Sequence, residues 1–385
     1  MPTRTRKPGV NPPGGGPRRT IRLSPASAAA ARDIARAWRR LTGGSAVRDN
    51  DRRTLLACSG GADSSALVLA LCSAVTRPAE RFVVGHVLHD LRTAAEARAD
   101  RDRAEALAAL VHVPFVEARV RVRARRGNAE ANARAARYDA LARLARKART
   151  PFVASAHHAD DVLETLLINL CRGAGPAGMR GPAPVRELVL GVTLVRPMLS
   201  IDRAACEAIC RDAGWAWAHD ATNDDATRAR AMLRERVLPA LRAFWPRAAR
   251  NASSFAALQR DIASDAPAAD FGPPLDATDV QITIARSALR ALSPARAGDV
   301  LRAARAALAG SAGAGSLAAV RVREAVAAAR DAGTHTREFA WPGAHVVVAG
   351  EAVRVSPLIK PPRGPRAERP APARGGARAS RASRR

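Results

Sequence analysis

The stretch LLACSGGADSSALVLAL, residues 55–71, decides the fold of this chain. A short apolar run ends at Cys58, a Ser-Gly-Gly turn follows, and an Ala- and Leu-rich segment of helical character begins at about Asp63. Glycines let backbone amides approach an anion closely, and a helix N-terminus adds partial positive charge. The stretch therefore predicts a phosphate-binding turn made of Ser59, Gly60, Gly61, Ala62, Asp63, Ser64 and Ser65.

The alternative for this turn is an ordinary strand-to-helix corner capped by Asp or Ser. Such a corner does not require Ser-Gly-Gly and Asp-Ser together, so phosphate binding is the better interpretation. The turn also lacks the lysine of the GxxxxGK[ST] motif, which excludes a Walker-type loop.

Short apolar runs alternate with longer amphipathic ones on both sides of this turn. The runs at 54–58, 81–88, 113–120 and 151–156 are too short for helices and have the character of buried strands. Helical patterns follow them at about 64–76, 93–110, 129–148 and 158–171. This alternation predicts an α/β fold with a Rossmann-like parallel sheet covered on both faces.

Composition divides the chain into four parts. Residues 1–20 and 360–385 are basic and rich in Pro, Gly or Arg, and both are predicted to be disordered tails. Between them we predict an α/β domain with the phosphate-binding turn at 21–225 and a mainly helical domain with a terminal hairpin at 226–359. A linker is expected near 264–276, where Pro, Gly and Asp gather.

The net charge of +28 favours a polyanionic partner. Residues 1–20 hold five basic groups and no acid, and residues 360–385 hold nine against one, so the rest of the chain still carries +15. Arg-rich composition alone is the alternative explanation. The surplus on the predicted folded part nevertheless favours nucleic-acid binding.

The five cysteines are scattered and odd in number, which argues against a disulfide framework. No run approaches the roughly 20 apolar residues needed to cross a bilayer. The basic N-terminus has no apolar segment of a secretory signal after it. We therefore expect a cytoplasmic protein without a membrane partner.

Ser59, Gly60, Gly61, Asp63 and Ser64 match the SGGxDS signature of the PP-loop ATP pyrophosphatase family, which this chain resembles. The resemblance implies cleavage of ATP between its α- and β-phosphates and transfer of AMP to an oxygen of the substrate. Loop 59–65 would hold pyrophosphate, and Asp63 would hold Mg²⁺. A carboxylate beside a phosphate cradle is repulsive unless a divalent cation lies between them, which agrees with this assignment.

Four further stretches resemble the tRNA(Ile)-lysidine synthases within that family. They are HVLHDLR (86–92), AEANARAARY (129–138), ASAHHADDVLETLLINLCRGAG (154–175) and DATNDDATRARAMLRERVLP (220–239). The likeness covers about residues 50–245. It implies a partner tRNA(Ile) with a CAU anticodon, free L-lysine as second substrate, and ATP and Mg²⁺ as cofactors.

Asp161 and Glu164 lie three residues apart in the third stretch and share one face of the expected helix. Such a pair can hold an ammonium or a metal, although an acidic first turn that complements the helix dipole is the alternative. The resemblance assigns the pair to the lysine substrate. His157 at the strand end has either a structural role or a catalytic, phosphate-contacting one.

Arginines supply the remaining candidates. Arg134 and Arg137 share a helix face with Glu130 one turn earlier, so a surface ion pair is the alternative to a role at phosphate. The resemblance places this region beside the adenylylated intermediate and favours Arg134. Arg230 and Arg234 match the arginines of the RNxxR element, but Ala231 replaces its asparagine.

The implied reaction transfers AMP to the carbon-2 oxygen of the wobble cytidine, and lysine then displaces AMP to form lysidine. The sequence does not decide whether Asp161 or Glu164 accepts the proton of the amine. Alternatives are tRNA thiolation, which the lack of a CxxC pair disfavours, and a nucleotide- or RNA-binding module without chemistry. A homodimer remains open, and the Lys-Lys motif of the family's C-terminal domain is not found.

Overall fold

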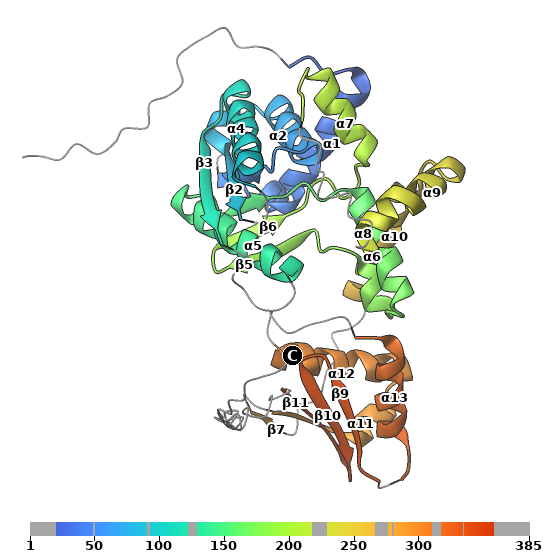
Figure 1. The fold of residues 1–385 in the computed structure, drawn as a ribbon. Helices are drawn as coiled ribbons and strands as arrows, with labels where there is room; N and C mark the ends of the chain where they lie inside the picture. The colour runs from blue at the N-terminus through green and yellow to red at the C-terminus, as the bar shows by residue number, and fades with distance from the viewer. Residues whose placement is uncertain are drawn as a thin grey trace, which may run out of the picture. The chain divides into compact units, whose positions relative to one another are not determined.

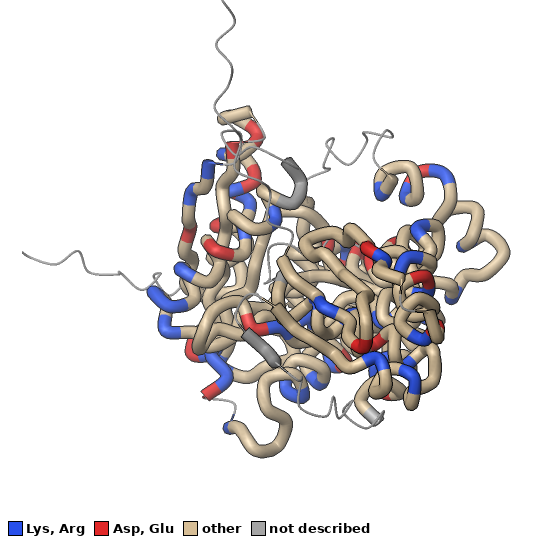
Figure 2. The backbone as a smooth tube through the Cα atoms, turned by 90° about the horizontal axis from the view of Figure 1, so that it is seen from below, with Lys and Arg blue, Asp and Glu red and all other residues tan. Residues whose placement is uncertain are grey.

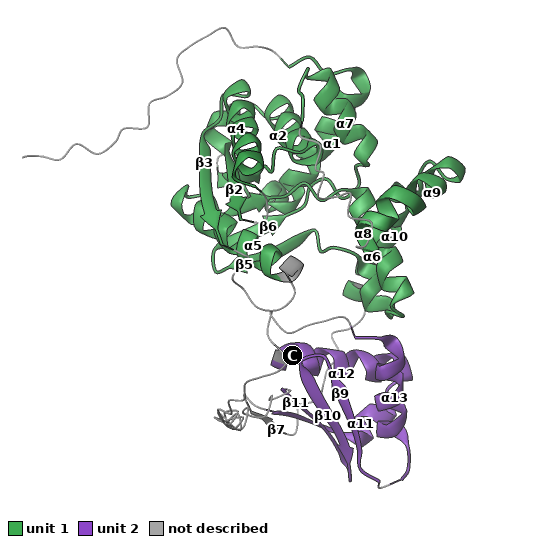
Figure 3. Ribbon diagram, in the orientation of Figure 1, with its two compact units in different colours: residues 1–268 green, residues 269–385 purple. Residues whose placement is uncertain are grey.

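The structure is a computed structural model that describes residues 21–48, 51–90, 93–121, 129–217, 229–265, 276–278, 281–309, 317–333 and 335–357. The chain divides into two compact units, residues 1–268 and 269–385, which are described separately (Figures 1 and 3). Both predicted basic tails, 1–20 and 360–385, lie outside the described residues.

Unit 1 is built on a six-stranded sheet of order β3-β2-β1-β4-β6-β5. Its strands are β1 (Thr54–Ala57), β2 (Phe82–His89), β3 (Phe115–Val120), β4 (Phe152–Ala154), β5 (Val185–Val189) and β6 (Val192–Val195). All neighbours pair in parallel except β5 and β6, which form an antiparallel hairpin. The chain moves outward from β1 to β3 and then returns to place β4 on the other side of β1. Open α/β sheets bind ligands at the carboxyl ends of strands beside such a reversal.

Helices cover both faces of this sheet. They are α1 (Pro25–Leu41), α2 (Ala62–Ala74), the short α3 (Pro78–Arg81), α4 (Ala94–Leu110), α5 (Ala129–Lys147) and α7 (Arg203–Asp212). Helices α1, α2, α4 and α7 share one buried cluster with Leu56, whereas α5 shares another with Leu55. Neighbouring strand residues face opposite sides of a sheet, so these two leucines mark its two covered faces. The predicted Rossmann-like α/β fold is confirmed.

Two parts of unit 1 were not predicted. Helix α1 packs against the sheet through fully buried Trp38. Nε1 of this side chain donates a hydrogen bond to Thr54 Oγ1 at 2.9 Å, and its ring packs edge-to-face against Phe82. The β5–β6 hairpin turns at Leu190 and Gly191, where Gly191 adopts a φ of +79°. Its strands are short, and the outer strand β5 is largely exposed, so the hydrophobic pattern is weak.

The boundary between the units lies later in the chain than the predicted 225/226. Helices α8 (Ala229–Met232), α9 (Leu238–Phe244) and α10 (Ala248–Asp265), with a π-helical turn at Leu233–Val237, all belong to unit 1. They remain there because α10 and Leu238 bury apolar side chains against α6 (Ala159–Cys171). The predicted linker is compatible with the later boundary, but residues 266–275 lie outside the described part.

Unit 2 is a mixed α/β unit rather than a mainly helical domain with a hairpin. Its antiparallel sheet has the order β7-β8-β11-β10-β9, formed by β7 (Asp276–Thr278), β8 (Gln281–Ala285), β9 (Arg337–Trp341), β10 (Ala344–Ala349) and β11 (Ala352–Pro357). Helices α11 (Arg286–Ala291), α12 (Pro294–Ala309) and α13 (Ala319–Arg330) share one core with this sheet. Strands β7 and β8 precede the Ala-rich helices and were not predicted.

Three expectations from composition can be compared with the structure. All five cysteines are free thiols. None of the helices among the described residues is long and apolar enough to span a bilayer. Figure 2 shows Lys and Arg at many separate positions along the backbone tube, so the basic residues are not confined to one segment of the described chain.

Candidate functional site

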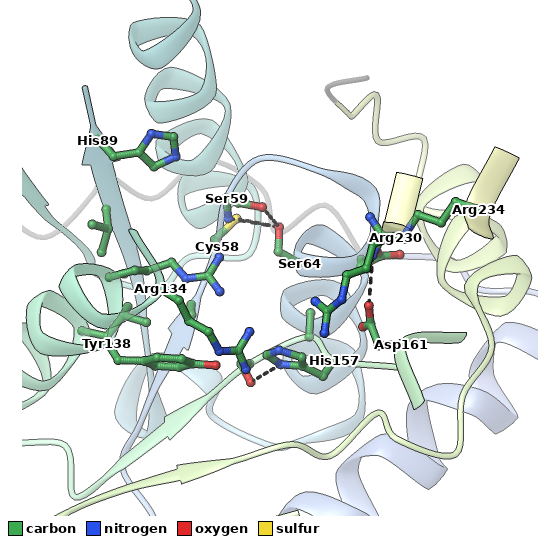
Figure 4. Close-up of a pocket in the computed structure, with 18 residues that line it drawn as sticks. Cys58, Ser59, Ser64, His89, Arg134, Tyr138, His157, Asp161, Arg230 and Arg234 are labelled. Carbon is green, nitrogen blue, oxygen red and sulfur yellow. Dashed lines mark hydrogen bonds and ion pairs between the residues drawn. The ribbon is translucent and has the colours of Figure 1, made fainter. Parts of the chain in front are cut away.

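A pocket of about 320 Å³ opens in unit 1 at the carboxyl ends of β1, β2 and β4. Side chains and backbone from the Ser-Gly-Gly loop, from the His157 segment after β4, and from α5 and α8 line it (Figure 4). Arg134 and Arg230 approach it from opposite sides, one from α5 and the other from α8. The reversal of strand order at β1 therefore coincides with seven of the predicted site residues, which are Ser59, Asp63, Ser64, Arg134, His157, Asp161 and Arg230.

The loop has the shape that the sequence predicts. Gly60 adopts a φ of +89°, and a Cβ atom at this position would lie 3.1 Å from the backbone oxygen of Asp100. Both observations require glycine there. The Ser64 hydroxyl accepts from the Ser59 amide and donates to the Gly61 carbonyl, each at 3.1 Å, so Ser64 fixes the turn from within.

Ser65 is placed away from the pocket. Its side chain is fully buried, and its Oγ accepts a hydrogen bond from Trp215 Nε1 at 3.2 Å. The predicted hydroxyl contact with phosphate is therefore not the contact seen here. Ala62 is also buried and belongs to the first turn of α2, so the pocket side of the loop consists of Ser59, Asp63 and Ser64.

Asp63 lines the pocket from the first turn of α2, and its carboxylate fits a divalent cation that is shared with phosphate. Its Oδ1 is buried without a hydrogen-bond partner among the described residues, while Oδ2 lies 3.2 Å from His158 Nε2. No group of three His, Cys, Asp or Glu in the described part of the chain is arranged to hold a metal alone. Mg²⁺ is commonly held by one or two carboxylates together with substrate phosphates, which is the arrangement that Asp63 suits.

Asp161 and Glu164 share one face of α6, as predicted, and a guanidinium bridges them. Arg234 Nε donates to Glu164 Oε1 at 2.5 Å, and its Nη2 donates to Glu164 Oε2 at 3.0 Å and to Asp161 Oδ1 at 3.2 Å. Glu164 is buried and does not line the pocket, whereas Asp161 and Arg234 do. Burial raises the pKa of Glu164 even though Arg234 opposes this shift.

The two adjacent histidines differ in charge. Burial lowers the pKa of His157 to about 3, with Asp161 opposing and Arg196 reinforcing the shift, so this ring is neutral at physiological pH. Its Nδ1 lies 2.9 Å from Ser155 Oγ. Burial also disfavours charge on His158, but Asp161, Asp160 and Asp63 outweigh it and raise the pKa of His158 well above its ordinary value.

Arginines form the cationic wall of the pocket. The guanidinium carbons of Arg134 and Arg137 lie 5.2 and 5.6 Å from the ring centroid of Tyr138. Neither of them, nor Arg230, forms an ion pair with a carboxylate among the described residues. Burial lowers the pKa of Arg134, and the nearby Arg137 adds to this despite the opposing effect of Tyr138. Such a wall suits a polyphosphate ligand.

Some parts of the site escaped the sequence-based prediction. Arg196, which is buried at the end of β6, adds positive potential at His157 and Tyr138. No sequence signal pointed to Arg196, because β6, the strand that it follows, was not predicted. Asp160, by contrast, connects α6 with α7 and α9. Its carboxylate accepts hydrogen bonds from the backbone amide of Arg203 at 2.7 Å and from Arg242 Nη2 at 2.6 Å. The side chain of Glu130 and residues 218–228 lie outside what the structure describes.

Comparison with known proteins identifies the family. The PP-loop domain family matches residues 31–241, a range that contains every residue lining the pocket. The tRNA(Ile)-lysidine synthase of Bordetella parapertussis is 40% identical over 259 residues, which cover 65% of this chain and 74% of that protein. The chain belongs to the tRNA(Ile)-lysidine synthase family.

Other relatives extend this comparison. The tRNA(Ile)-lysidine synthase of Methylobacterium sp. (strain 4-46) is 41% identical over 220 residues, covering 57% of this chain and 62% of that protein. Among solved structures, the U34-tRNA thiolase NcsA from Methanococcus maripaludis gives a TM-score of 0.48 at 13% identity, covering 61% of this chain and 80% of that one. The resemblance drawn from the SGGADSS loop and the HHADD element is confirmed at the level of the family.

Proposed function

We propose that this protein is an ATP-dependent ligase that joins free lysine to carbon 2 of the wobble cytidine in the CAU anticodon of tRNA(Ile). The observation that carries the proposal is a single pocket that combines the Ser-Gly-Gly loop, the Asp63 carboxylate, an arginine wall and the Asp161 carboxylate. Each group meets one requirement of the reaction. The loop binds phosphate, Asp63 binds the cation, the arginine wall stabilises negative charge, and Asp161 recognises the amine.

The first step forms an adenylylated tRNA. The carbon-2 oxygen of the cytidine attacks the α-phosphorus of ATP, and the bond between the α-phosphorus and its bridging oxygen breaks to release pyrophosphate. Loop amides near Gly60 and Gly61 hold the leaving pyrophosphate at the N-terminus of α2. Arg134 and Arg230, on opposite sides of the pocket, face the negative charge that develops on the phosphates. Mg²⁺ bound at Asp63 would neutralise part of that charge.

The second step forms lysidine. The ε-amine of lysine attacks carbon 2, the bond from carbon 2 to oxygen breaks, and AMP leaves with that oxygen. The amine loses a proton, and Asp161 is the carboxylate of the acidic pair that lines the pocket. Burial keeps His157 neutral at physiological pH and disfavours its charged form, so its ring is assigned a positioning role beside the phosphate.

Cysteine chemistry supports lysidine formation over thiolation. Cys58 is the cysteine among the residues lining the pocket, and burial raises the pKa of its thiol. A sulfur carrier works as a thiolate, which such burial disfavours. Burial also raises the pKa of Cys210 to about 12.

The test combines a tRNA(Ile) transcript with ATP and radiolabelled lysine, and measures pyrophosphate release and lysine in the tRNA. Asp63→Asn is expected to lower both by roughly 100-fold, because the cation loses its charged protein ligand. Asp33→Asn is the matched control, since Asp33 is half-exposed on α1 and pairs with Arg36. A transcript with guanosine at the wobble position should take up no lysine. Pyrophosphate release without lysine incorporation would contradict the proposal.

A further inference from the structure

The acidic pair on α6 is already occupied by a cation from the same chain. Glu164 is 1% exposed, and its two oxygens accept hydrogen bonds from Nε and Nη2 of Arg234 at 2.5 and 3.0 Å. The same Nη2 also donates to Asp161. One guanidinium therefore bridges the two carboxylates that the proposed function assigns to the lysine substrate.

A cation is required at this position whether or not substrate is bound. A buried carboxylate without a partner is strongly unfavourable, and Glu164 lies beneath the pocket surface. The third carboxylate of the element, Asp160, is committed to Arg203 and Arg242 and contributes nothing to this pair. Arg234 is thus the counter-ion that allows α6 to carry Glu164 inside the fold.

Arg234 also lies between the pocket and Glu164. Its side chain is 28% exposed and lines the pocket together with Asp161, whereas Glu164 does not line it. An ammonium that enters from the pocket reaches Asp161 first and meets the guanidinium before Glu164. Arg234 belongs to the π-helical turn Leu233–Val237, a type of irregularity that is frequent at functional sites.

We propose that Arg234 is an internal counter-ion of the Asp161–Glu164 pair that the ammonium of free lysine displaces, so that Arg234 sets the affinity for this substrate. This inference rests on the proposed function. On displacement, charge is conserved at the pair because one monocation replaces another. The released guanidinium remains on the pocket wall with Arg230, where it adds to the groups that face phosphate.

The displacement has a measurable effect on apparent affinity. The apparent affinity of a ligand that competes with an internal occupant equals its intrinsic affinity multiplied by the fraction of time for which the site is vacant. If the guanidinium occupies the pair about nine-tenths of the time, the apparent affinity for lysine is about tenfold weaker than the intrinsic one. Removing the guanidinium should therefore tighten lysine binding, which is the opposite of what loss of an ordinary substrate contact does.

The experiment compares Arg234→Gln with Arg236→Gln, an exposed arginine on the same turn that does not line the pocket. The KM for lysine in lysidine formation and the lysine-induced rise in melting temperature without tRNA are measured at pH 7 and pH 8.5. We expect Arg234→Gln to lower the KM about tenfold, to lower kcat, and to enlarge the lysine-induced rise. The higher pH keeps Glu164 ionised once its partner is removed. Arg236→Gln should behave like the unsubstituted protein.

A lysine KM that is unchanged or raised at both pH values, with a wild-type lysine-induced rise, would overturn the inference. If Arg234→Gln does not fold, Arg234→Lys provides the answer: a single ammonium cannot make the forked contact, so the KM should still fall. An unchanged KM in that variant would also overturn it. Failure of the proposed function looks different, because the unsubstituted protein would then incorporate no lysine at all.

Discussion

Each unit contains an arginine at a decisive position, and the groups around the two guanidiniums differ. In unit 2, Arg286 is 1% exposed, and its guanidinium donates to the carbonyl oxygens of Ala328, Ala329, Gly333 and Gly350 at 2.7–3.1 Å. In unit 1, Arg134 borders an open pocket beside Arg137 and Arg230, with the Tyr138 ring as its neutral neighbour.

The difference shows which arginine belongs to the fold and which to a ligand. The carbonyls at the C-terminal end of α13 carry partial negative charge, so backbone alone satisfies Arg286. Like charges around Arg134 repel it and lower its pKa together with burial. An anion in the pocket would remove that repulsion. Substitution of Arg286 should therefore reduce stability, and substitution of Arg134 should reduce activity.

The largest expected effect is that of Arg286→Met on stability. The substitution keeps most of the volume but leaves several buried carbonyls without donors, so the free energy of unfolding should fall by about 3 kcal/mol or more. Urea-induced unfolding measures it. Arg323→Met, at an exposed position on the same helix α13, is the control and should change stability by less than about 0.5 kcal/mol. Equal losses in both variants would remove the distinction drawn above.

Arg134→Gln tests the other side of the comparison. Loss of one cation facing the phosphates should lower pyrophosphate release by about 10- to 100-fold, or roughly 1.4–2.7 kcal/mol of barrier. The melting temperature should be unchanged or slightly higher, because a repelling charge is removed. Arg143→Gln is the control, since Arg143 is exposed on α5 and does not line the pocket. A lower melting temperature with unchanged kinetics would make Arg134 a structural residue like Arg286.

The sequence predicts those parts of the fold in which the hydrophobic periodicity and the length of a segment indicate the same type of secondary structure. The four runs up to and including β4 alternate with long amphipathic segments, and each of the resulting strands and helices lies within a few residues of its prediction. Helix α1 was missed because its burial depends on tertiary partners such as Thr54 and Phe82. The β5–β6 hairpin was missed because β5 is largely exposed and β6 is placed by its pairing with β4. The strands β7 and β8 were missed because β8 pairs with β11, which lies far along the chain, and β7 pairs with β8.

For the site, sequence identifies the residues better than it identifies their partners. Parallel strands bring the loop at Ser59 and the His157 segment to one edge, so their meeting follows from the fold. That Arg234 bridges Asp161 and Glu164 does not follow, because it depends on how α8 and its π-helical turn lie against α6. Ser65 shows the same limit, since only the position of Trp215 decides where its hydroxyl points.

The smallest expected effect concerns pH and the neutral histidine of the pocket. The pKa of His157 in the folded protein is about 3, mainly because burial disfavours its charged form, whereas an unfolded histidine has a pKa of about 6.5. Between these values the unfolded chain binds a proton that folded His157 does not. Stability is therefore lost as pH falls below about 6.5, and this loss continues toward the folded value.

His157→Asn should remove that dependence. From pH 7 to pH 5.5 the variant is expected to lose roughly 1 kcal/mol less unfolding free energy than the unsubstituted protein, as urea-induced unfolding at both pH values would measure. His158 has the opposite sign, because its raised pKa makes its contribution present at low pH and lost as pH rises. It is present in both proteins, so the difference between them isolates His157. His112→Asn is the matched control: His112 is exposed and has a φ of 52°, a conformation that asparagine tolerates. If both variants keep the full acid sensitivity, His157 is protonated in the folded state, and the arginine wall beside it does not act on this ring as positive charge.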